Sequence, residues 1–554
     1  MRLSPAARAL ALAATLPLFL APRFAVAQSD TWALTNARIQ TVTKGVIEKG
    51  TIIVRKGLIE AIGPALTIPQ DARVIDLAGK TVSPGLIDLT SSLGLAAPAA
   101  PTGGNFGGGG GGGGAQNQGG PRGIEAERDA ARELKVTPGD IKPVRDAGVT
   151  AVLVAPARGL FRGTSALVPL RDSVDASAVV RDPVAMHIGY QGVQGDYPAT
   201  LLGVITYQRQ ALYDAQRQAL LLDRFKTNPR GMVRPENDAR VDALVPVVKG
   251  ELPAFIEANN ENEIRRAIHL TKEFNLKTAV VGATEGWLAL DALAGRPVII
   301  SMNFPQPAQV TGWSYRMSVR HAPNDSAAAA RQVQKLVEGN AAALNKAGIR
   351  FAIASGGSRD FVANVRKAIA AGLPANVALE AVTIRAAELA GAGEVLGSIE
   401  PGKIANLVVT NGDILSDSAK VSTVFVDGIR YDGPPVSAPR PANGAGNGGG
   451  GGAAAQIGGS WTMTLNSPQG PLDLTMTVNQ SGSTFSGSMT SMMGTQTIDE
   501  GQVNGRNVSW SMTMQVGGQS ITLNYRGQVE GTRMTGSAEL GSFGSATFTA
   551  EKKP

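Results

Sequence analysis

The feature that most constrains the fold of this chain is a regular alternation of strand-like and helix-like segments between Gly123 and about Ala390. Alternation of this kind is typical of βα units, in which parallel strands form a sheet and helices cover it. The spacing of the segments favours a (β/α)8 barrel of the TIM type over an open sheet. The expected strands are Val149–Ala155, Val184–Ile188, Pro253–Ala258, Thr278–Gly282, Val298–Ser301 and Phe351–Ser355, and the expected helices include Asn262–Phe274, Ser326–Ala347 and Asn376–Leu389.

One more buried strand is expected ahead of this region, in the stretch Thr81–Ser92 (TVSPGLIDLTSS). Its β-branched and apolar residues surround a tight turn at Pro84-Gly85, which indicates a short strand entered through that turn. Because such barrels carry their active sites at the carboxyl ends of the strands, the residues that end this stretch are candidates for chemistry.

The same stretch resembles the first barrel strand of the amidohydrolase superfamily, and in particular of its imidazolonepropionase-like secreted branch. In that family PGLID is followed by x-H-x-H, and the two histidines, which point the same way from the strand, hold a divalent metal ion. In this chain the two histidine positions are Thr90 and Ser92. The resemblance implies that the barrel is retained and that these two metal ligands are lost.

The resemblance extends from about Trp32 to Asp432 and implies a composite β-sandwich beside the barrel. The first piece of the sandwich carries LTNARI and EKGTIIVRKGLIEAIG, and the second carries LGSIEPGKIANLVV and VSTVFVDGIRYD. Relatives usually have PGKDADL where this chain has PGKIANL, a change that drops two carboxylates and keeps the strand pattern. We therefore expect the sandwich at residues 28–81 and 396–433, and the barrel at residues 82–395.

The other metal-ligand positions of the family are changed as well. On strand five relatives typically have FIHAN, and this chain has FIEAN, with Glu257 in the place of the histidine. Strand six lacks its histidine, although Glu285 resembles an acidic residue common in this branch, and strand eight has Gly356-Gly357 where the catalytic aspartate would lie. Metal-assisted hydrolysis needs at least three protein ligands, so the family's zinc or other divalent metal is not expected here, nor is another cofactor. The pocket candidates are Asp88, Thr90, Ser92, Glu257, Asn259, Glu285 and His321.

The chain has three histidines, and none falls on a motif position of the family. His269 lies beside charged residues on one face of an expected helix, which predicts exposure to solvent. His187 lies within an expected strand and is interpreted as a core residue rather than a ligand, whereas His321 follows strand seven and is a candidate for the barrel mouth. An alternative site is an acidic pair of Glu257 and Glu285, able in principle to hold a cation or share a proton.

The N-terminal 27 residues have the composition of a secretion signal peptide. They combine Arg2 and Arg8 with an apolar run and end in Ala25-Val26-Ala27, which predicts a mature start near Gln28 and export to the periplasm or the medium. The chain has no cysteine, which excludes disulfides and thiolate chemistry. Its net charge of +7 falls to +4 without the three arginines of the signal, and this balance argues against nucleic acid as a partner. No apolar run is long enough for a transmembrane helix.

Two stretches have the composition of flexible segments. Residues 96–121 contain eight consecutive glycines and leave the end of the first barrel strand, and residues 434–457 are interpreted as a linker. Beyond the linker, residues 458–554 alternate apolar and polar side chains between turn pairs such as Asn504-Gly505. This pattern predicts a separate antiparallel β-meander or small barrel, loosely similar to lipocalin or avidin folds.

Three hypotheses for function follow from the sequence. The leading one is an exported amidohydrolase-like pseudoenzyme that binds a small molecule, or that acts as a partner of an active amidohydrolase paralogue or of its own copies. The activity implied by the resemblance is metal-dependent hydrolysis of non-peptide C–N bonds or of dipeptide-like substrates. The second hypothesis is an active hydrolase with an altered site that uses Glu257, Glu285 and one histidine. The third places the function in the C-terminal β-domain, as a binder of a small apolar ligand or of the cell envelope.

Overall fold

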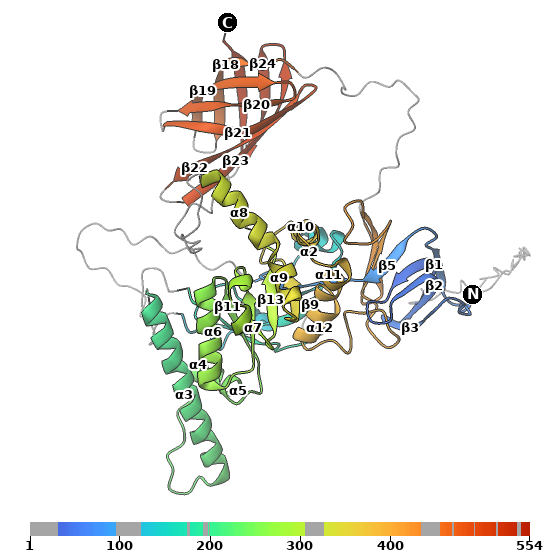
Figure 1. Ribbon diagram of the computed structural model, residues 1–554, viewed down its shortest axis with the longest axis vertical. Coiled ribbons are helices and arrows are strands. Elements are labelled where there is room, and N and C mark those ends of the chain that lie inside the picture. Colours follow the sequence, from blue (N-terminus) through green and yellow to red (C-terminus); the bar gives the residue numbers. More distant parts are fainter. Residues whose placement is uncertain are drawn as a thin grey trace, which may run out of the picture. The chain divides into compact units, whose positions relative to one another are not determined.

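The computed structural model describes residues 31–95, 123–173, 178–191, 198, 200–304, 326–433, 455–467, 470–491, 494–516, 519–539 and 545–553. The predicted signal peptide, the glycine-rich insert, most of the predicted linker and His321 lie outside these residues. The chain divides into two compact units, one ending at Ser437 and the other starting at Ala438 (Figure 1). Within the described ranges, no helix is long and apolar enough to cross a membrane.

Strands from both ends of the first unit form one composite sheet. Its order is β17-β16-β15-β5-β1-β2-β3, and β4 pairs with β1. Strands β5 and β15 run antiparallel, so Thr81 lies opposite Thr410, 329 residues away in the sequence. This pairing confirms that the two expected sandwich pieces come together. The strands are β1 (Thr31–Gln40), β2 (Val46–Arg55), β3 (Leu58–Gly63), β4 (Arg73–Asp76), β5 (Thr81–Pro84), β15 (Leu407–Thr410), β16 (Val421–Val426) and β17 (Ile429–Asp432).

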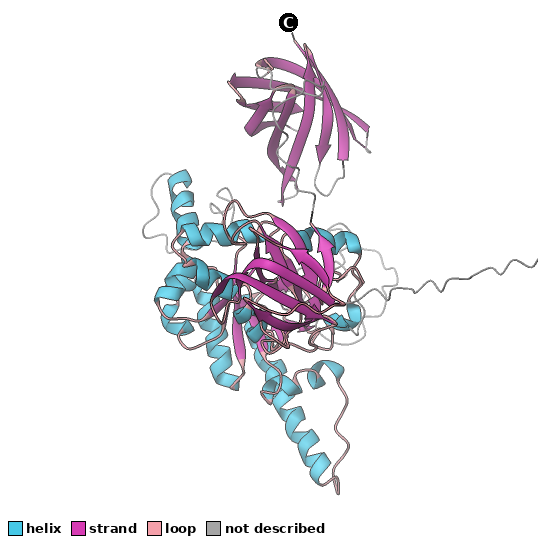
Figure 2. Ribbon diagram, turned by 90° about the vertical axis from the view of Figure 1, so that its right-hand side faces the viewer, coloured by secondary structure: helices cyan, strands magenta, loops and turns pink. Residues whose placement is uncertain are grey.

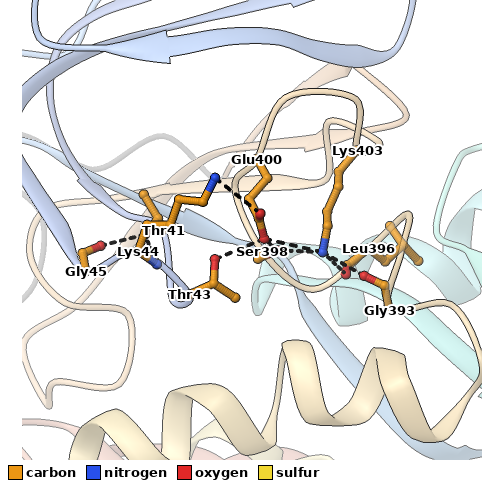
Figure 3. A network of polar contacts seen from close by, with 9 residues as sticks. All are labelled: Thr41, Thr43, Lys44, Gly45, Gly393, Leu396, Ser398, Glu400 and Lys403. Atoms are coloured by element: carbon orange, nitrogen blue, oxygen red, sulfur yellow. Dashed lines mark hydrogen bonds and ion pairs between the residues drawn. The ribbon is translucent and has the colours of Figure 1, made fainter.

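A polar network centred on Lys403 ties the turn between β1 and β2 to the segment that precedes β15 (Figure 3). The ammonium of Lys403 donates to the carbonyl oxygen of Gly393 (2.6 Å) and to Ser398 Oγ (2.7 Å). Glu400 Oε1 accepts from Ser398 Oγ (2.6 Å) and from Thr43 Oγ1 (2.9 Å), which lies in the turn. The hydrogen bond from Ser398 is the main cause that lowers the pKa of the Glu400 carboxyl.

Replacing Lys403 by Met is expected to lower the free energy of unfolding by about 2 kcal/mol, because its acceptors would lose a nearly buried charged donor. The Lys403 side chain is 12% exposed. Lys44 is the matched control, since it is 64% exposed and lies 3.6 Å from the same Glu400. Lys44→Met should change stability by about 0.5 kcal/mol or less in urea denaturation. Equal losses in the two variants would contradict a structural role for this network.

The barrel of the first unit has eight positions around its axis. In order they are filled by β6, β7, the bent segment β9–β8, β10, β11, β12, β13 and β14. Ser355, directly after β14, donates its backbone N–H to Asp88 Oδ1 on β6 (2.8 Å), so the last strand meets the first. The strands are β6 (Leu86–Ser91), β7 (Val149–Val154), β8 (Phe161–Thr164), β9 (Ala166–Pro169), β10 (Met186–Ile188), β11 (Ala254–Ala258), β12 (Thr278–Gly282), β13 (Val298–Ser301) and β14 (Phe351–Ala354).

The third barrel position departs from the regular βα pattern. Strand β9 pairs antiparallel with β7, and β8 pairs antiparallel with β10, whereas β6 with β7 and β10 through β14 pair in parallel. An antiparallel strand can follow its neighbour through a short loop, so no crossover helix is required at this position. The TIM-like barrel is confirmed, with one strand reversed relative to the expected (β/α)8 arrangement.

Helices pack around the barrel strands, and α3 extends away from the rest of this unit in both views (Figures 1 and 2). Helix α6 begins with a capping box in which Asn260 and Glu263 exchange hydrogen bonds, the local signal that starts a helix directly after β11. The helices are α1 (Ala130–Glu133), α2 (Pro138–Asp146), α3 (Leu201–Thr227), α4 (Ala239–Asp242), α5 (Val245–Val248), α6 (Glu261–Phe274), α7 (Leu290–Leu293), α8 (Ser326–Glu338), α9 (Asn340–Lys346), α10 (Phe361–Ala370), α11 (Ala375–Ala381) and α12 (Ile384–Leu389).

The C-terminal unit is a closed antiparallel barrel, which confirms the predicted β-domain. Its apolar positions point inward and fill the interior with large side chains, among them Trp461, Met476, Trp510 and Phe548. Trp510 stacks on Tyr525 with ring centroids 4.9 Å apart. The strands are β18 (Gly459–Ser467), β19 (Gly470–Ser481), β20 (Thr484–Ser491), β21 (Gly494–Asn504), β22 (Asn507–Val516), β23 (Gln519–Glu530), β24 (Arg533–Glu539) and β25 (Ser545–Lys552).

Candidate functional site

A polar cavity of about 510 Å³ lies at the carboxyl ends of the barrel strands. Five of the predicted pocket residues line it: Thr90, Ser92, Glu257, Asn259 and Glu285. A sixth, Asp88, lies deeper in the barrel and is buried, and the seventh, His321, is not among the described residues. The sequence did not single out the other polar lining residues, which include Arg162, Glu263, Ser301 and Asn303.

Strand alternation explains why these side chains point into the barrel. Phe255, Val281 and Ile299 cluster in the interior, whereas the residues beside them in sequence pack beneath the helices. His187 lies opposite Phe255 in the parallel pairing of β10 and β11 and therefore faces the interior too. Glu257, two residues after Phe255, projects from the same face into the cavity.

Asp88 and Thr90 join the first and last strands of the barrel. Asp88 Oδ1 accepts the backbone N–H groups of Ser355 (2.8 Å) and Thr90 (3.1 Å), and Thr90 Oγ1 accepts that of Gly356 (2.7 Å). Burial raises the pKa of the Asp88 carboxyl, while these hydrogen bonds act in the opposite direction. The threonine at the first metal-ligand position thus closes the barrel through its hydroxyl group.

An ion pair between Arg162 and Glu257 lies in the lining of the cavity. Arg162 Nη1 on β8 donates to Glu257 Oε2 on β11 (2.6 Å), and the two side chains are 6% and 31% exposed. Gly189 leaves room for the guanidinium, since a Cβ at that position would lie 2.1 Å from Arg162 Nη2. Asn259 Nδ2 donates to the other Glu257 oxygen (3.3 Å), so both oxygens of the carboxylate have protein donors.

The two glutamates proposed as an acidic pair have different partners in the structure. Glu285 is buried and accepts the backbone N–H of Glu261 through Oε2 (3.0 Å), which caps the start of α6. Burial is the main cause that raises the pKa of Glu285, and the nearby carboxylates of Glu261 and Glu263 add to it. Glu257 is instead compensated by Arg162. The arrangement therefore places a charged pair and a carboxyl with raised pKa in the same cavity.

The two histidines among the described residues lie in different environments. His187 is buried against the Phe255 ring, with centroids 5.5 Å apart, and its Nε2 has no hydrogen-bond partner among the described residues. Burial, with a smaller contribution from the Arg162 charge, lowers the pKa of His187 to about 3. His269 on α6 is exposed and lies 4.0 Å from Glu273, as its helix face predicted. His321 lies outside the described residues.

The low pKa of His187 predicts a loss of stability in acid. Between pH 6.5, its ordinary value, and pH 3, the unfolded chain binds a proton that the folded protein excludes, so stability falls as the pH is lowered through this range. We expect His187→Leu to lose about 2 kcal/mol less stability than the wild type between about pH 7 and about pH 4. Urea denaturation at both pH values measures this difference. Parallel acid curves for the two proteins would contradict the buried neutral imidazole.

The side chains of the cavity do not fit a catalytic divalent metal. Hydroxyl groups stand at Thr90 and Ser92, and a guanidinium already holds Glu257, the remaining acidic ligand position. In the described part of the chain, no group of three His, Cys, Asp or Glu side chains is arranged to hold an ion. On strand eight, Gly356 has φ +63°, and a Cβ there would lie 1.8 Å from Ser301 Oγ. The three carboxylates of the cavity, those of Glu257, Glu263 and Glu285, are instead engaged by Arg162 and by backbone N–H groups at the start of α6, so they do not supply the three converging ligands that such an ion requires.

A βα barrel flanked by a composite sheet, with its polar pocket at the carboxyl ends of the strands, defines the amidohydrolase class of fold. Comparisons with known proteins agree. The model of the Amidohydrolase family matches residues 251–430. An amidohydrolase structure from Thermotoga maritima superposes with a TM-score of 0.58 at 21% identity, covering 72% of this chain and 99% of that one. Residues 251–430 thus match the Amidohydrolase family in sequence, and the first unit has the fold of the amidohydrolase superfamily.

Two curated relatives match parts of the sequence. Imidazolonepropionase of Vibrio cholerae is 42% identical over 72 residues, which is 12% of this chain and 18% of the relative. Amidohydrolase tasK of Hapsidospora irregularis is 24% identical over 434 residues, which is 71% of this chain and 41% of the relative. The chain thus spans less than half the length of these relatives.

Proposed function

We propose that the protein is an exported amidohydrolase-superfamily pseudoenzyme that binds a small polar molecule in the barrel mouth and does not perform the metal-dependent hydrolysis of the family. The observation that carries the proposal is the ion pair of Arg162 and Glu257. A fixed guanidinium at 2.6 Å from this carboxylate competes with a metal ion for the same oxygen and repels it. Export rests on the signal-like composition of residues 1–27.

The chemistry of the cavity supports a polar ligand. Its wall offers the partly exposed Glu257 carboxylate, the hydroxyl of Ser92 and the amide of Asn303, together with the apolar surface of Phe255 and Val281. Pockets with a few placed polar groups and an apolar wall hold small molecules in a defined orientation. An active amidohydrolase paralogue or a second copy of this chain remains the proposed macromolecular partner.

Hydrolysis assays with added and removed metal test this proposal. Imidazolonepropionate, the compound after which one relative is named, and simple amides are suitable substrates. We expect no turnover after purification, after chelation or after addition of zinc. Zinc-dependent turnover that Glu257→Gln abolishes would contradict the proposal. Such a result would show that Glu257 binds the metal ion instead of only pairing with Arg162.

A second candidate function is metal-independent hydrolysis by the altered site. The raised pKa of Glu285 favours it, since a carboxyl that stays protonated closer to neutral pH can act as a general acid. This candidate predicts turnover that is insensitive to chelators and lost in Glu285→Gln. Ligand binding inside the C-terminal barrel is not favoured, because large apolar side chains fill its interior.

A further inference from the structure

We propose a second binding site, separate from the barrel mouth, in a cavity of about 270 Å³ between α3 and α6. The ligand class that fits it is a small carboxylate that also carries a hydroxyl group. The ligand would be held by Tyr190, Gln208, Arg266 and Leu270, all of which line the cavity. The proposal does not depend on the function assigned to the barrel mouth.

The first observation is an unsatisfied acceptor at Gln208. This side chain is completely buried on α3, and its Nε2 donates to the carbonyl oxygen of Gly189 (2.8 Å). That hydrogen bond fixes the orientation of the amide group, so the remaining oxygen, Oε1, is identified. Gln208 Oε1 has no partner among the described residues. A buried acceptor without a donor costs about 1–3 kcal/mol, which a hydroxyl group on a ligand would recover.

Tyr190 supplies a complementary donor. Its hydroxyl oxygen is also buried without a partner in the described part of the chain. Burial raises the pKa of Tyr190, so the phenol keeps its proton at neutral pH and can donate a hydrogen bond. An acceptor and a donor that both lack partners thus line one cavity, which distinguishes it from an ordinary groove between helices.

Arg266 provides the charge that selects an anion. Its two neighbouring arginines are compensated, since Arg209 lies 2.7 Å from Glu273 and Arg265 lies 2.8 Å from Asp291. Arg266 lines the cavity and its charge acts on Tyr190, and none of the ion pairs between described side chains involves it. One uncompensated guanidinium favours a single carboxylate, which it can bind through two parallel hydrogen bonds.

The apolar part of the cavity limits the ligand to a small size. Ile205 on α3 and Leu270 on α6 contribute hydrocarbon surface between the polar groups. At about 270 Å³ the cavity is smaller than a drug-sized pocket. A hydroxycarboxylate of three or four carbons would place its carboxylate near Arg266, its hydroxyl group near Gln208 Oε1 and its methyl or methylene groups on this surface.

Calorimetric titration of the full chain with three matched compounds tests the site. Lactate carries both the carboxylate and the hydroxyl group, propionate lacks the hydroxyl group, and propane-1,2-diol lacks the carboxylate. We expect lactate to bind about tenfold more tightly than either of the others. The comparison removes a group from the ligand, so that Gln208 itself need not be replaced. A substitution at this completely buried position would disturb the packing of α3.

Arginine variants then locate the binding. Arg266→Gln should weaken lactate binding about tenfold or more, whereas Arg217→Gln, an exposed position on α3 outside the cavity, should leave it within about twofold of the wild type. The proposal is overturned if lactate shows no binding up to about 50 mM, if propionate binds equally well, or if the two arginine variants lose the same affinity.

Discussion

Gly356→Ala is expected to lower the free energy of unfolding by about 3 kcal/mol, through left-handed backbone strain and a collision inside the barrel. The residue has φ +63°, and a Cβ would lie 1.8 Å from Ser301 Oγ and 2.9 Å from Asn303 Cβ. Its backbone also closes the barrel, because its N–H donates to Thr90 Oγ1. Urea denaturation followed by circular dichroism measures the loss.

The neighbouring residue is a matched control for this prediction. Gly357 has φ +81° and nothing within 4 Å of the position that a Cβ would take. Gly357→Ala should therefore show the backbone strain alone, about 1 kcal/mol. If both variants lose the same stability, the steric account of Gly356 is wrong. If it is right, an aspartate cannot be restored at this position without moving Ser301.

The second large effect is expected for Glu257→Gln, which should destabilise the protein by about 3 kcal/mol because it leaves the buried Arg162 guanidinium without a charged partner. The 6% exposure of Arg162 is the reason for this magnitude. Replacing both residues, as Arg162→Met with Glu257→Leu, should restore stability to within about 1 kcal/mol of the wild type, since no unpaired charge then remains.

A surface ion pair on α6 provides the comparison. Glu261 Oε1 lies 2.9 Å from Arg265 Nε, and both side chains are more than a third exposed. Glu261→Gln should cost less than about 1 kcal/mol, because solvent screens that pair. A loss for Glu257→Gln as small as that for Glu261→Gln, or a double variant no more stable than Glu257→Gln, would show that Arg162 is not dependent on Glu257.

The parallel strands of the barrel were predictable because they are short apolar runs bounded by turn residues. Thr278–Gly282 and Val298–Ser301 are expected and observed with identical ends, and the ends of the other four expected strands lie within about two residues of the observed ones. Their carboxyl ends could also be located, and Thr90, Ser92, Glu257 and Asn259, named as pocket candidates for that reason, line the cavity. The alternation in residues 458–554 likewise predicted the antiparallel barrel.

Arg162 and the reversed strand that carries it were not predictable from local pattern. The segment Phe161–Pro169 contains an arginine, two small residues and a threonine among its apolar residues, which resembles a loop more than a buried strand. The charge of Arg162 is compensated by Glu257, which lies 95 residues further along the chain. The neutral state of His187 also depends on burial among distant strands and on the Arg162 charge. Such features are set by tertiary packing, so only the structure reveals them.

The central claim is that the barrel mouth is organised around the Arg162–Glu257 pair instead of a metal ion, and zinc titration of the protein tests it most directly. Protein that has been treated with chelator and returned to buffer should bind substoichiometric zinc with low affinity, and Glu257→Gln should not change that result. Tight binding of one zinc ion per chain that is lost in Glu257→Gln would contradict the claim.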